Sequence, residues 1–284
     1  MRRKKVQLYI TQTKVYGNEN IIGKYALTTR IKIYKTVVRP TIFHNIEGWS
    51  IINKKNIEEL ENIQATILKK VCDMRVTTSY LGLLSELGIW PVKKHIEYKK
   101  LILFHNIITS KNNRALKEII EDELEYTWPG CWIESVKLIC NEYKINIEEI
   151  KNYSKQKLKN QLKEIIKEQL NAEIKDMTKN KTKLRFIKEF STKTYLKKLE
   201  YQDSIIMLKT RLNMIEVKHN FKSLFAENLK CNICNMEDTT EHLLNCINKS
   251  KLTKEDIIRQ NKEVVNIIKT NIKERKKQGY IVTI

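Results

Sequence analysis

Residues 157–177 read KLKNQLKEIIKEQLNAEIKDM and decide the fold class of this chain. Apolar side chains recur in this stretch at three- and four-residue steps, which is the period of an α-helix with one buried face. The members of this apolar stripe are Leu158, Leu162, Ile165, Ile166, Leu170, Ile174 and Met177. We therefore expect a long helix whose stripe faces a core and whose interleaved lysines form a solvated face.

The sequence around this helix is poor in residues that interrupt helices. The 284 residues include seven Gly and three Pro, and residues 131–278 contain neither. Since Gly and Pro are the strongest turn signals, this scarcity disfavours a many-stranded sandwich or barrel and predicts an all-α fold. The chain also lacks the Gly-rich loops that hold nucleotide phosphates and the G-x-S-x-G turn of serine hydrolases.

The chain is strongly basic, with 54 Lys plus Arg against 33 Asp plus Glu and a net charge of +21. Such an excess is far beyond what solubility requires and points to a polyanionic partner, RNA or DNA. A membrane surface is the competing polyanion, but no apolar run approaches the roughly 20 residues of a spanning helix. Residues 1–5 are not followed by a signal-peptide core. We expect a soluble intracellular protein, in the nucleus or the cytoplasm, without a membrane partner.

Three helices are expected in the first 110 residues. Residues 26–39 carry a helical apolar pattern that Pro40 should end. Residues 57–72 form the clearest amphipathic pattern of this part, with Asn56 as the expected N-cap. A third helix should run over residues 91–108, with its Pro in the first turn.

Local charge divides the chain into segments. Residues 114–150 hold four basic and nine acidic residues, whereas residues 151–230 hold 20 basic and nine acidic residues. We interpret the acidic stretch as the joint between two modules; the alternative is a charged surface of one continuous domain. The expected segments are a helical unit at 1–112, an acidic joint at 113–150, a basic helical region at 151–230, a metal-binding segment at 231–250 and a basic C-terminal helix or tail at 251–284.

Positive side chains alternate with aromatic ones in parts of the chain, an arrangement that can contact phosphates and stack on bases. The alternative for each group is a solvated lysine face. The basic run at 273–277 is interpreted as a solvated helix end, with nuclear targeting as the alternative. The candidate nucleic-acid contacts are Arg30, Lys32, Lys35, Arg39, Lys179, Lys181, Lys183, Arg185, Lys188, Lys209 and Arg211.

One motif has the spacing of a metal site: Cys231-x2-Cys234-x7-His242-x3-Cys246. Two Cys two residues apart can share one metal from a tight loop, and residues four apart lie on one face of a helical turn. Asp238 is the expected N-cap of that turn. Four protein ligands leave no open position for a reactive water, so the spacing predicts a structural Zn²⁺.

The alternative is that three Cys and one His coincide in a helical tail without binding metal. The other cysteines, Cys72, Cys131 and Cys140, stand in apolar contexts where buried thiols are common. In a reducing compartment, clustered cysteines favour a metal over disulfides.

Three blocks of sequence are informative together. They are residues 30–40 (RIKIYKTVVRP), residues 85–91 (SELGIWP) and the Cys-Cys-His-Cys motif with its preceding Glu237-Asp238. Together they resemble the C-terminal part of non-LTR (LINE-type) retrotransposon reverse transcriptases. The first is similar to the helix that follows the polymerase palm in that family, and the last to its terminal Cys-Cys-His-Cys segment.

The resemblance implies a thumb-like helical unit followed by a long basic helical region and a small zinc-binding segment. The family's Tyr-Gly-x-Glu-x-Trp turn is altered, because residues 44–49 (HNIEGW) keep Glu and Trp but replace Tyr and Gly. No Asp-Asp occurs, and the paired aspartates that hold catalytic metal ions in the family are missing. We therefore expect a nucleic-acid-binding fragment that is not an enzyme on its own. The alternative is a helical, zinc-containing protein-interaction module.

Overall fold

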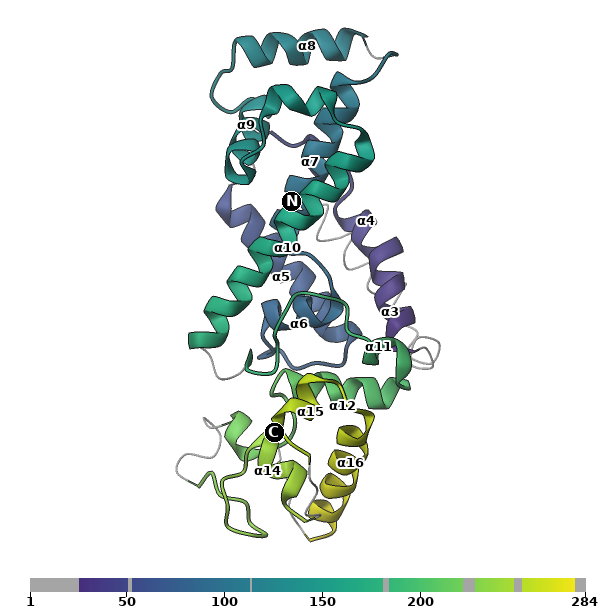
Figure 1. Cartoon of the computed structure of the whole chain (residues 1–284), viewed down its shortest axis with the longest axis vertical. Coiled ribbons are helices and arrows are strands. Elements are labelled where there is room, and N and C mark those ends of the chain that lie inside the picture. Colours follow the sequence, from purple (N-terminus) through teal and green to yellow (C-terminus); the bar gives the residue numbers. More distant parts are fainter. Residues whose placement is uncertain are drawn as a thin grey trace. The chain divides into compact units, whose positions relative to one another are not determined.

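The computed structural model describes residues 26–50, 53–112, 114–180, 184–221, 228–247 and 252–278. Within these ranges the regular structure is helical apart from one isolated antiparallel bridge, which confirms the predicted all-α fold class (Figure 1). None of the helices in these ranges has the length and apolar character needed to cross a membrane.

Most helices are short, and a few irregular turns connect them. In chain order the elements are α3 (Leu27–Ile33), the π-helical turn η1 (Tyr34–Val38), α4 (Arg39–Ile42), the 3₁₀ turn η2 (Ile46–Gly48), α5 (Lys54–Val71), α6 (Tyr80–Leu87), α7 (Val92–Ile108), α8 (Arg114–Glu125), α9 (Trp132–Tyr143), the 3₁₀ turn η3 (Ile147–Asn152), α10 (Lys155–Asn180), α11 (Tyr195–Lys198), α12 (Tyr201–Arg211), the 3₁₀ turn η5 (Lys218–Phe221), α14 (Thr240–Asn245), α15 (Lys254–Ile258) and α16 (Lys262–Lys277).

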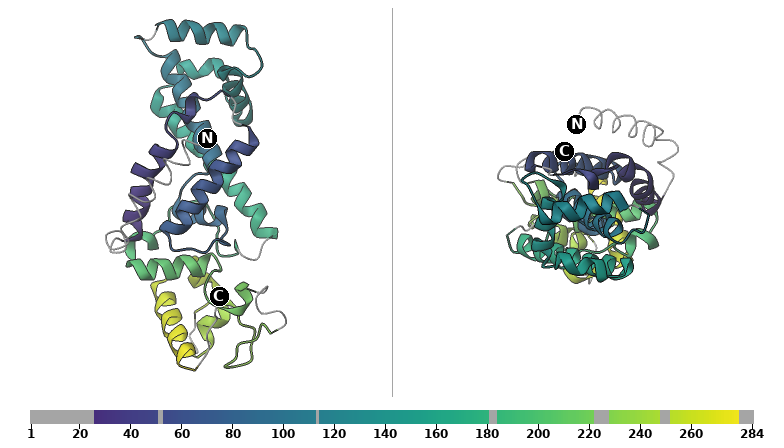
Figure 2. Two further views of the ribbon diagram at one scale, coloured as in Figure 1. Left: turned by 180° about the vertical axis from the view of Figure 1, so that it is seen from behind. Right: turned by 90° about the horizontal axis from the view of Figure 1, so that it is seen from above.

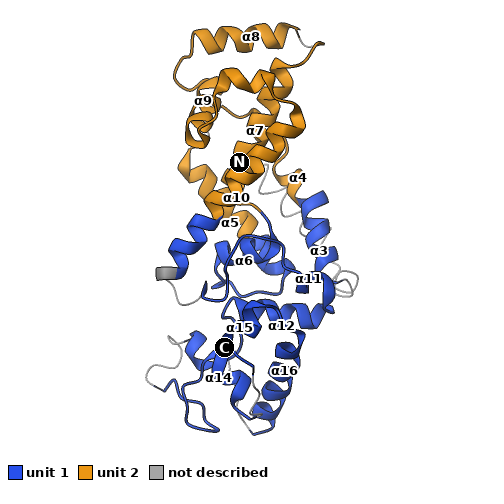
Figure 3. Ribbon diagram, in the orientation of Figure 1, with its two compact units in different colours: residues 1–38, 66–89, 171–284 blue, residues 39–65, 90–170 orange. Residues whose placement is uncertain are grey.

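The chain divides into two compact units, each built from separated segments (Figure 3). Unit 1 comprises residues 1–38, 66–89 and 171–284, and unit 2 comprises residues 39–65 and 90–170. Two of the four boundaries fall inside α5 and α10, so each of these helices contributes residues to both units. The five segments expected from composition stay a prediction.

Helix α7 is the centre of unit 2, where it contacts η2, α8, η3 and α9. Its side chains Val92, Leu101 and Phe104 are buried. Their removal from water is the main force that holds these short elements together. The expected helix at residues 91–108 is confirmed as α7, although Pro91 is its N-cap and not part of its first turn.

Helix α12 is the centre of unit 1, where it contacts α3, α11, α15 and α16, while α14 packs against α16 (Figure 2). Gly88 ends α6 in the left-handed conformation, with a φ of 57°. A Cβ atom at this position would clash with the Thr192 hydroxyl oxygen, so only Gly allows this close approach.

Two predicted helix ends are wrong. Helical backbone continues past Pro40 to Ile42. Pro40 cannot donate to the Thr36 carbonyl, and the π-helical turn η1 directly before it already departs from the α-helical bond pattern. Helix α5 begins at Lys54, earlier than expected, because the Asn53 side-chain oxygen caps it.

The expected apolar stripe of α10 faces the core at five of its seven positions, whereas Ile165 and Met177 are only partly buried. Along α10, Leu158, Leu162, Ile166, Leu170 and Ile174 are at most 1% exposed. The cysteines outside the motif, Cys72, Cys131 and Cys140, are buried as expected.

Candidate metal centre

Four side chains of unit 1 converge on one point: Cys231, Cys234, His242 and Cys246, whose ligand atoms all lie within 4.8 Å of one another. The Cys231 and Cys246 sulfurs are 3.6 Å apart, and the Cys234 sulfur is 3.2 Å from His242 Nε2. In a tetrahedral zinc site with bonds of about 2.0–2.3 Å, neighbouring ligand atoms lie about 3.3–3.8 Å apart. The cluster could therefore hold a metal ion with four protein ligands.

A tight turn presents the first two cysteines. The antiparallel bridge between Lys230 and Glu237 brings the chain back on itself. Within the turn between these two residues, the Cys231 N–H donates to the Met236 carbonyl at 2.7 Å. Asn235 adopts the left-handed conformation (φ 61°), which Asn tolerates better than most residues. The turn thereby aims both thiols to the same side.

Helix α14 presents His242, and its C-cap residue Cys246, four residues later, is the other ligand. The prediction that Asp238 caps this helix is wrong. Thr239 is the N-cap, and its hydroxyl accepts the His242 N–H at 3.0 Å. Asp238 is instead buried and makes tertiary contacts: its carboxylate accepts from the Lys218 N–H and from Arg275, each at 2.8 Å.

The surroundings favour the ligand form of two of the four side chains, Cys231 and His242, whereas burial raises the pKa of Cys246 to about 11. Burial alone would raise the pKa of Cys231. Hydrogen bonds from the Ile233 and Cys234 backbone, together with Arg275, outweigh this effect, so the pKa lies below its ordinary value. Burial lowers the pKa of His242, and Arg275 acts in the same direction. A thiolate and a neutral imidazole are the forms that bind metal.

Arg275 was not predicted as part of this site. It belongs to the basic run at 273–277, which was interpreted as a solvated helix end, yet its side chain is only 2% exposed. Its neighbours Lys276 and Lys277 are exposed. The available signal was helical spacing, because Arg275 follows the buried Ile268 and Asn271 at i+7 and i+4.

The candidate nucleic-acid contacts are dispersed. Lys181, Lys183 and the side chain of Lys179 lie outside the described residues, and Lys32 and Lys188 are exposed.

Two candidates at the start of unit 1 face the protein. Arg30 is buried, and its guanidinium lies 4.1 Å from the centre of the Tyr201 ring. The Lys35 ammonium donates to the Leu87 and Gly88 carbonyls, each at 3.3 Å. It thereby satisfies carbonyl groups at the end of α6, where the helix leaves them without a partner of its own.

Three further candidates are partly buried and have contacts with the protein. Arg39 donates to the Trp90 carbonyl at 3.4 Å. Lys209 lies 3.8 Å from the Asp73 carboxylate. Arg185 pairs with Glu241 on α14 at 2.5 Å.

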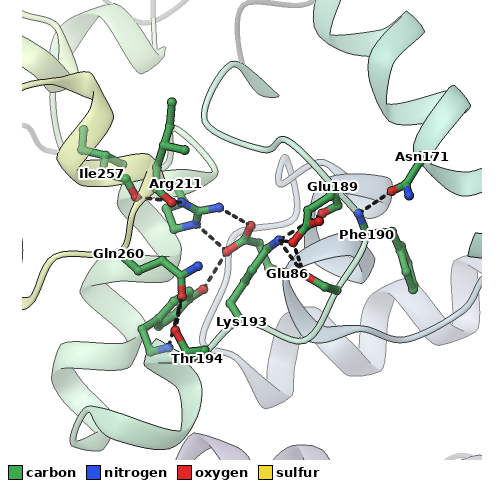
Figure 4. A network of polar contacts seen from close by, with 12 residues as sticks. Glu86, Asn171, Glu189, Phe190, Lys193, Thr194, Arg211, Ile257 and Gln260 are labelled. Carbon is green, nitrogen blue, oxygen red and sulfur yellow. Dashed lines mark hydrogen bonds and ion pairs between the residues drawn. The ribbon is translucent and has the colours of Figure 1, made fainter.

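The last candidate, Arg211, lies inside a buried polar network (Figure 4). Its Nε and Nη2 donate to the two Glu86 oxygens at 2.7 and 2.9 Å, and its Nη1 donates to the Ile257 carbonyl at 2.7 Å. The Tyr195 hydroxyl also donates to Glu86, at 3.0 Å. The network joins α6, α11, α12 and α15, so its role is structural and we leave Arg211 out of the proposed nucleic-acid surface.

Unit 2 contains a pocket of about 210 Å³ with mainly apolar walls. At its polar side the Lys100 ammonium donates to the Trp49 and Ser50 carbonyls and to the Ser135 hydroxyl, at 2.6 to 2.8 Å. Burial lowers the pKa of Lys100 to about 8. Because these three acceptors use the three N–H groups of the ammonium, Lys100 presents no donor to a ligand.

Comparisons with protein-family models, with curated proteins and with solved structures returned no match. The functional proposal therefore depends on the geometry and charge of the residues above.

Proposed function

We propose that this chain is a zinc-containing protein that binds RNA or DNA and has no catalytic activity of its own. The observation that carries the proposal is a row of exposed lysines on α16. This helix belongs to the same unit as the four-ligand cluster and packs against α14 (Figure 1).

The ligand chemistry favours zinc. Three sulfurs and one imidazole form a ligand set typical of structural zinc sites. With all four positions taken by protein atoms, the ion would act by holding the turn at residues 231–234 to α14.

A metal analysis tests the zinc proposal directly. Protein purified with zinc present and then dialysed should contain one zinc per chain, and Cys234→Ser should lose most of it. Cys72→Ala is the matched control, because Cys72 lies outside the cluster. Wild-type protein that contains no zinc would overturn the proposal.

The lysine row has the geometry of a phosphate-binding surface. Lys262, Lys269, Lys273 and Lys276 are exposed, and their spacing of seven, four and three residues places them on one face of α16. Lys269 also contacts Asp203. The row extends over about 21 Å at 1.5 Å per residue, which is long enough to follow several successive phosphates.

Salt dependence tests the nucleic-acid proposal. The affinity for a labelled structured RNA should fall steeply as salt is added, because phosphate contacts release counterions. Replacing Lys262, Lys273 and Lys276 together by Gln should reduce the slope of log affinity against log salt by about 2 to 3.

The matched control removes the same charge from exposed lysines of unit 2, Lys54, Lys55 and Lys144. It should leave most of the affinity. An equal loss in both triple variants would show that net charge alone attracts the RNA, and an affinity independent of salt would overturn the proposal.

The resemblance to LINE-type reverse transcriptases gives a finer proposal, in which the chain corresponds to the thumb and terminal segment of such an enzyme. The packing of two motif blocks supports it, since Lys35 of the first block holds the Leu87 and Gly88 carbonyls of the second. An upstream reading frame that encodes paired aspartates, intact or decayed, would be the expected genomic finding. An upstream sequence unrelated to a polymerase would contradict it.

A protein-interaction module is the second candidate, and one surface favours it. On and beside α8, Leu116, Ile119 and Tyr126 are 42, 53 and 70% exposed. Their spacing of three and seven residues extends one apolar helix face. The nearby acidic residues would repel nucleic acid, so Leu116→Ser with Ile119→Ser should leave RNA binding intact. A loss of RNA affinity in this variant would contradict that separation of surfaces.

A further inference from the structure

Arg275 and Asp238 form a buried ion pair beside the metal cluster. Their side chains are 2% and 0% exposed, and Arg275 Nη1 lies 2.8 Å from Asp238 Oδ1. Asp238 stands between the two halves of the metal motif, whereas Arg275 is in the last turn of α16, 37 residues away. The pair therefore joins the C-terminal helix to the segment that carries the ligands.

The guanidinium charge also acts on the ligands themselves. Burial has the largest influence on the pKa of Cys231, His242 and Cys246, and the positive charge of Arg275 lowers the pKa of all three. Three thiolates around one divalent ion carry an excess negative charge, and a buried guanidinium beside a sulfur offsets part of it. Asp238 fixes the direction of that guanidinium, as carboxylates beside metal sites fix other ligand-shell groups.

Two more contacts hold the same parts together. The Asp238 carboxylate accepts the Lys218 N–H at 2.8 Å, which fixes the carboxylate in place. One turn before Arg275, the Asn271 amide donates to the Leu243 carbonyl of α14 at 2.5 Å. The face of α16 that carries Asn271 and Arg275 is thus docked on α14, and the lysine row is on the exposed face.

We propose that Arg275, oriented by Asp238, is a positioning residue of the metal centre, which strengthens metal binding and makes the docking of α16 depend on the metal. This inference rests on the proposed zinc site. It goes beyond that site by assigning a role to a residue that is no ligand. The competing explanation is an ion pair that only attaches a helix, which would leave the affinity for metal unchanged.

The test measures the zinc dissociation constant by competition with a chromogenic chelator. Arg275→Met removes both the charge and the donors, and we expect it to weaken zinc binding about 10- to 100-fold. Arg275→Lys keeps the charge without the planar fork and should have a smaller effect. Lys276→Met is the matched control, since Lys276 is the exposed neighbour on the same helix, and it should bind zinc as the wild type does.

Cobalt substitution provides a readout that helix attachment alone would not change. Co²⁺ in a tetrahedral three-sulfur, one-nitrogen site gives intense d–d and sulfur-to-metal bands. We expect Arg275→Met and Arg275→Lys to retain a tetrahedral spectrum with shifted sulfur-to-metal bands, because the positive charge beside the sulfurs has been removed or moved. Identical spectra and an unchanged zinc dissociation constant in both variants would overturn the inference.

Amide hydrogen exchange of α16 tests whether the docking of this helix depends on the metal. Chelation of zinc should accelerate exchange in α16 of the wild type while α7 in unit 2 stays protected. An α16 that stays equally protected without zinc would overturn the proposed dependence. A wild-type protein that binds neither Zn²⁺ nor Co²⁺ would overturn the zinc proposal as well, whereas tight wild-type binding with unaffected Arg275 variants would overturn this inference alone.

Discussion

Among the described residues of unit 1 are two buried arginine–carboxylate pairs, Glu86–Arg211 and Asp238–Arg275, and the two are satisfied in different ways. Arg211 places two nitrogens on Glu86 and donates its remaining terminal nitrogen to the Ile257 and Ile258 carbonyls. Arg275 places one nitrogen on Asp238, and its charge lowers the pKa of ligands in the metal cluster.

The different partners of the two arginines indicate which ion pair should respond to metal binding. A buried charge is tolerated only when its hydrogen-bonding groups find partners. Around Arg211 those partners are backbone and side-chain oxygens, which are present whether or not a metal binds. Arg275 has a partner in Asp238 and also lies near ligand sulfurs whose charge depends on the metal, so the second pair should respond to metal and the first should not.

Breaking the first pair should have the largest effect. Arg211→Met leaves the Glu86 carboxylate buried without its cation, and we expect a loss of about 3–5 kcal/mol in the free energy of unfolding. Urea unfolding measures this loss, which should be the same with and without chelator. The control is Lys209→Met, whose partner Asp73 is 72% exposed, and it should cost at most about 1 kcal/mol. Equal losses in both variants would contradict the burial argument.

Breaking the second pair should have a smaller effect that depends on zinc. Asp238→Asn keeps the shape but removes the charge that Arg275 faces, and we expect a local loss of about 2–3 kcal/mol in the opening free energy of α16. Native-state amide exchange measures it. After chelation the difference between variant and wild type should shrink, because α16 is then already loosened. A difference that stays constant would show that the two pairs are alike.

Lys100 in unit 2 differs from both arginines, because this buried cation donates to neutral oxygens and not to a carboxylate. Burial lowers its pKa from 10.5 to about 8. Between these two values the unfolded chain binds the proton more tightly than the folded one, so folding stability should increase as pH rises from about 8 to about 10. The expected gain is about 2 kcal/mol, at about 1.4 kcal/mol per pKa unit.

Urea unfolding of wild type and Lys100→Met across this pH range measures the gain. The variant should lack this contribution, so the difference between the two proteins should change with pH. Parallel pH profiles would indicate that Lys100 stays charged in the folded protein.

The smallest loss of stability is expected when only one hydrogen bond to the Glu86–Arg211 pair is removed. Tyr195→Phe removes one hydroxyl that donates to Glu86 at 3.0 Å but leaves both charges in place. Burial and the nearby Glu86 raise the pKa of Tyr195, so the hydroxyl remains protonated and acts as a donor. We expect a loss of about 1 kcal/mol in urea unfolding. A loss as large as that of Arg211→Met would mean that the hydroxyl, rather than the cation, satisfies Glu86.

The metal motif and the long helix could be predicted because both depend on local spacing. The ligands fall within 16 residues, and the stripe on α10 repeats at the helical period. The helix caps were harder, because Asn53 and Asn56 are both acceptable capping residues and only the structure shows which side chain accepts the backbone N–H. Asp238 illustrates the same limit, since its carboxylate is used by Arg275 and Lys218 rather than by α14.

The basic residues show what spacing cannot reveal. Arg211 and Arg275 look like neighbouring surface lysines in the sequence, yet both are buried against carboxylates that are 125 and 37 residues away. Lys262, Lys273 and Lys276 of the exposed row were outside the predicted contacts, although the helical period places them on one face. A cation's role depends on which carboxylate the tertiary fold brings to it.

The sequence by itself determined the helical fold class, the positive charge and the four clustered ligands. Each of these three features follows from composition or from the period of a helix, and none depends on contacts between distant parts of the chain. Only the tertiary structure decided which arginines are buried and which residue lies beside the metal cluster. The physical reason is that burying a charge requires a partner in space, and folding alone brings such partners together.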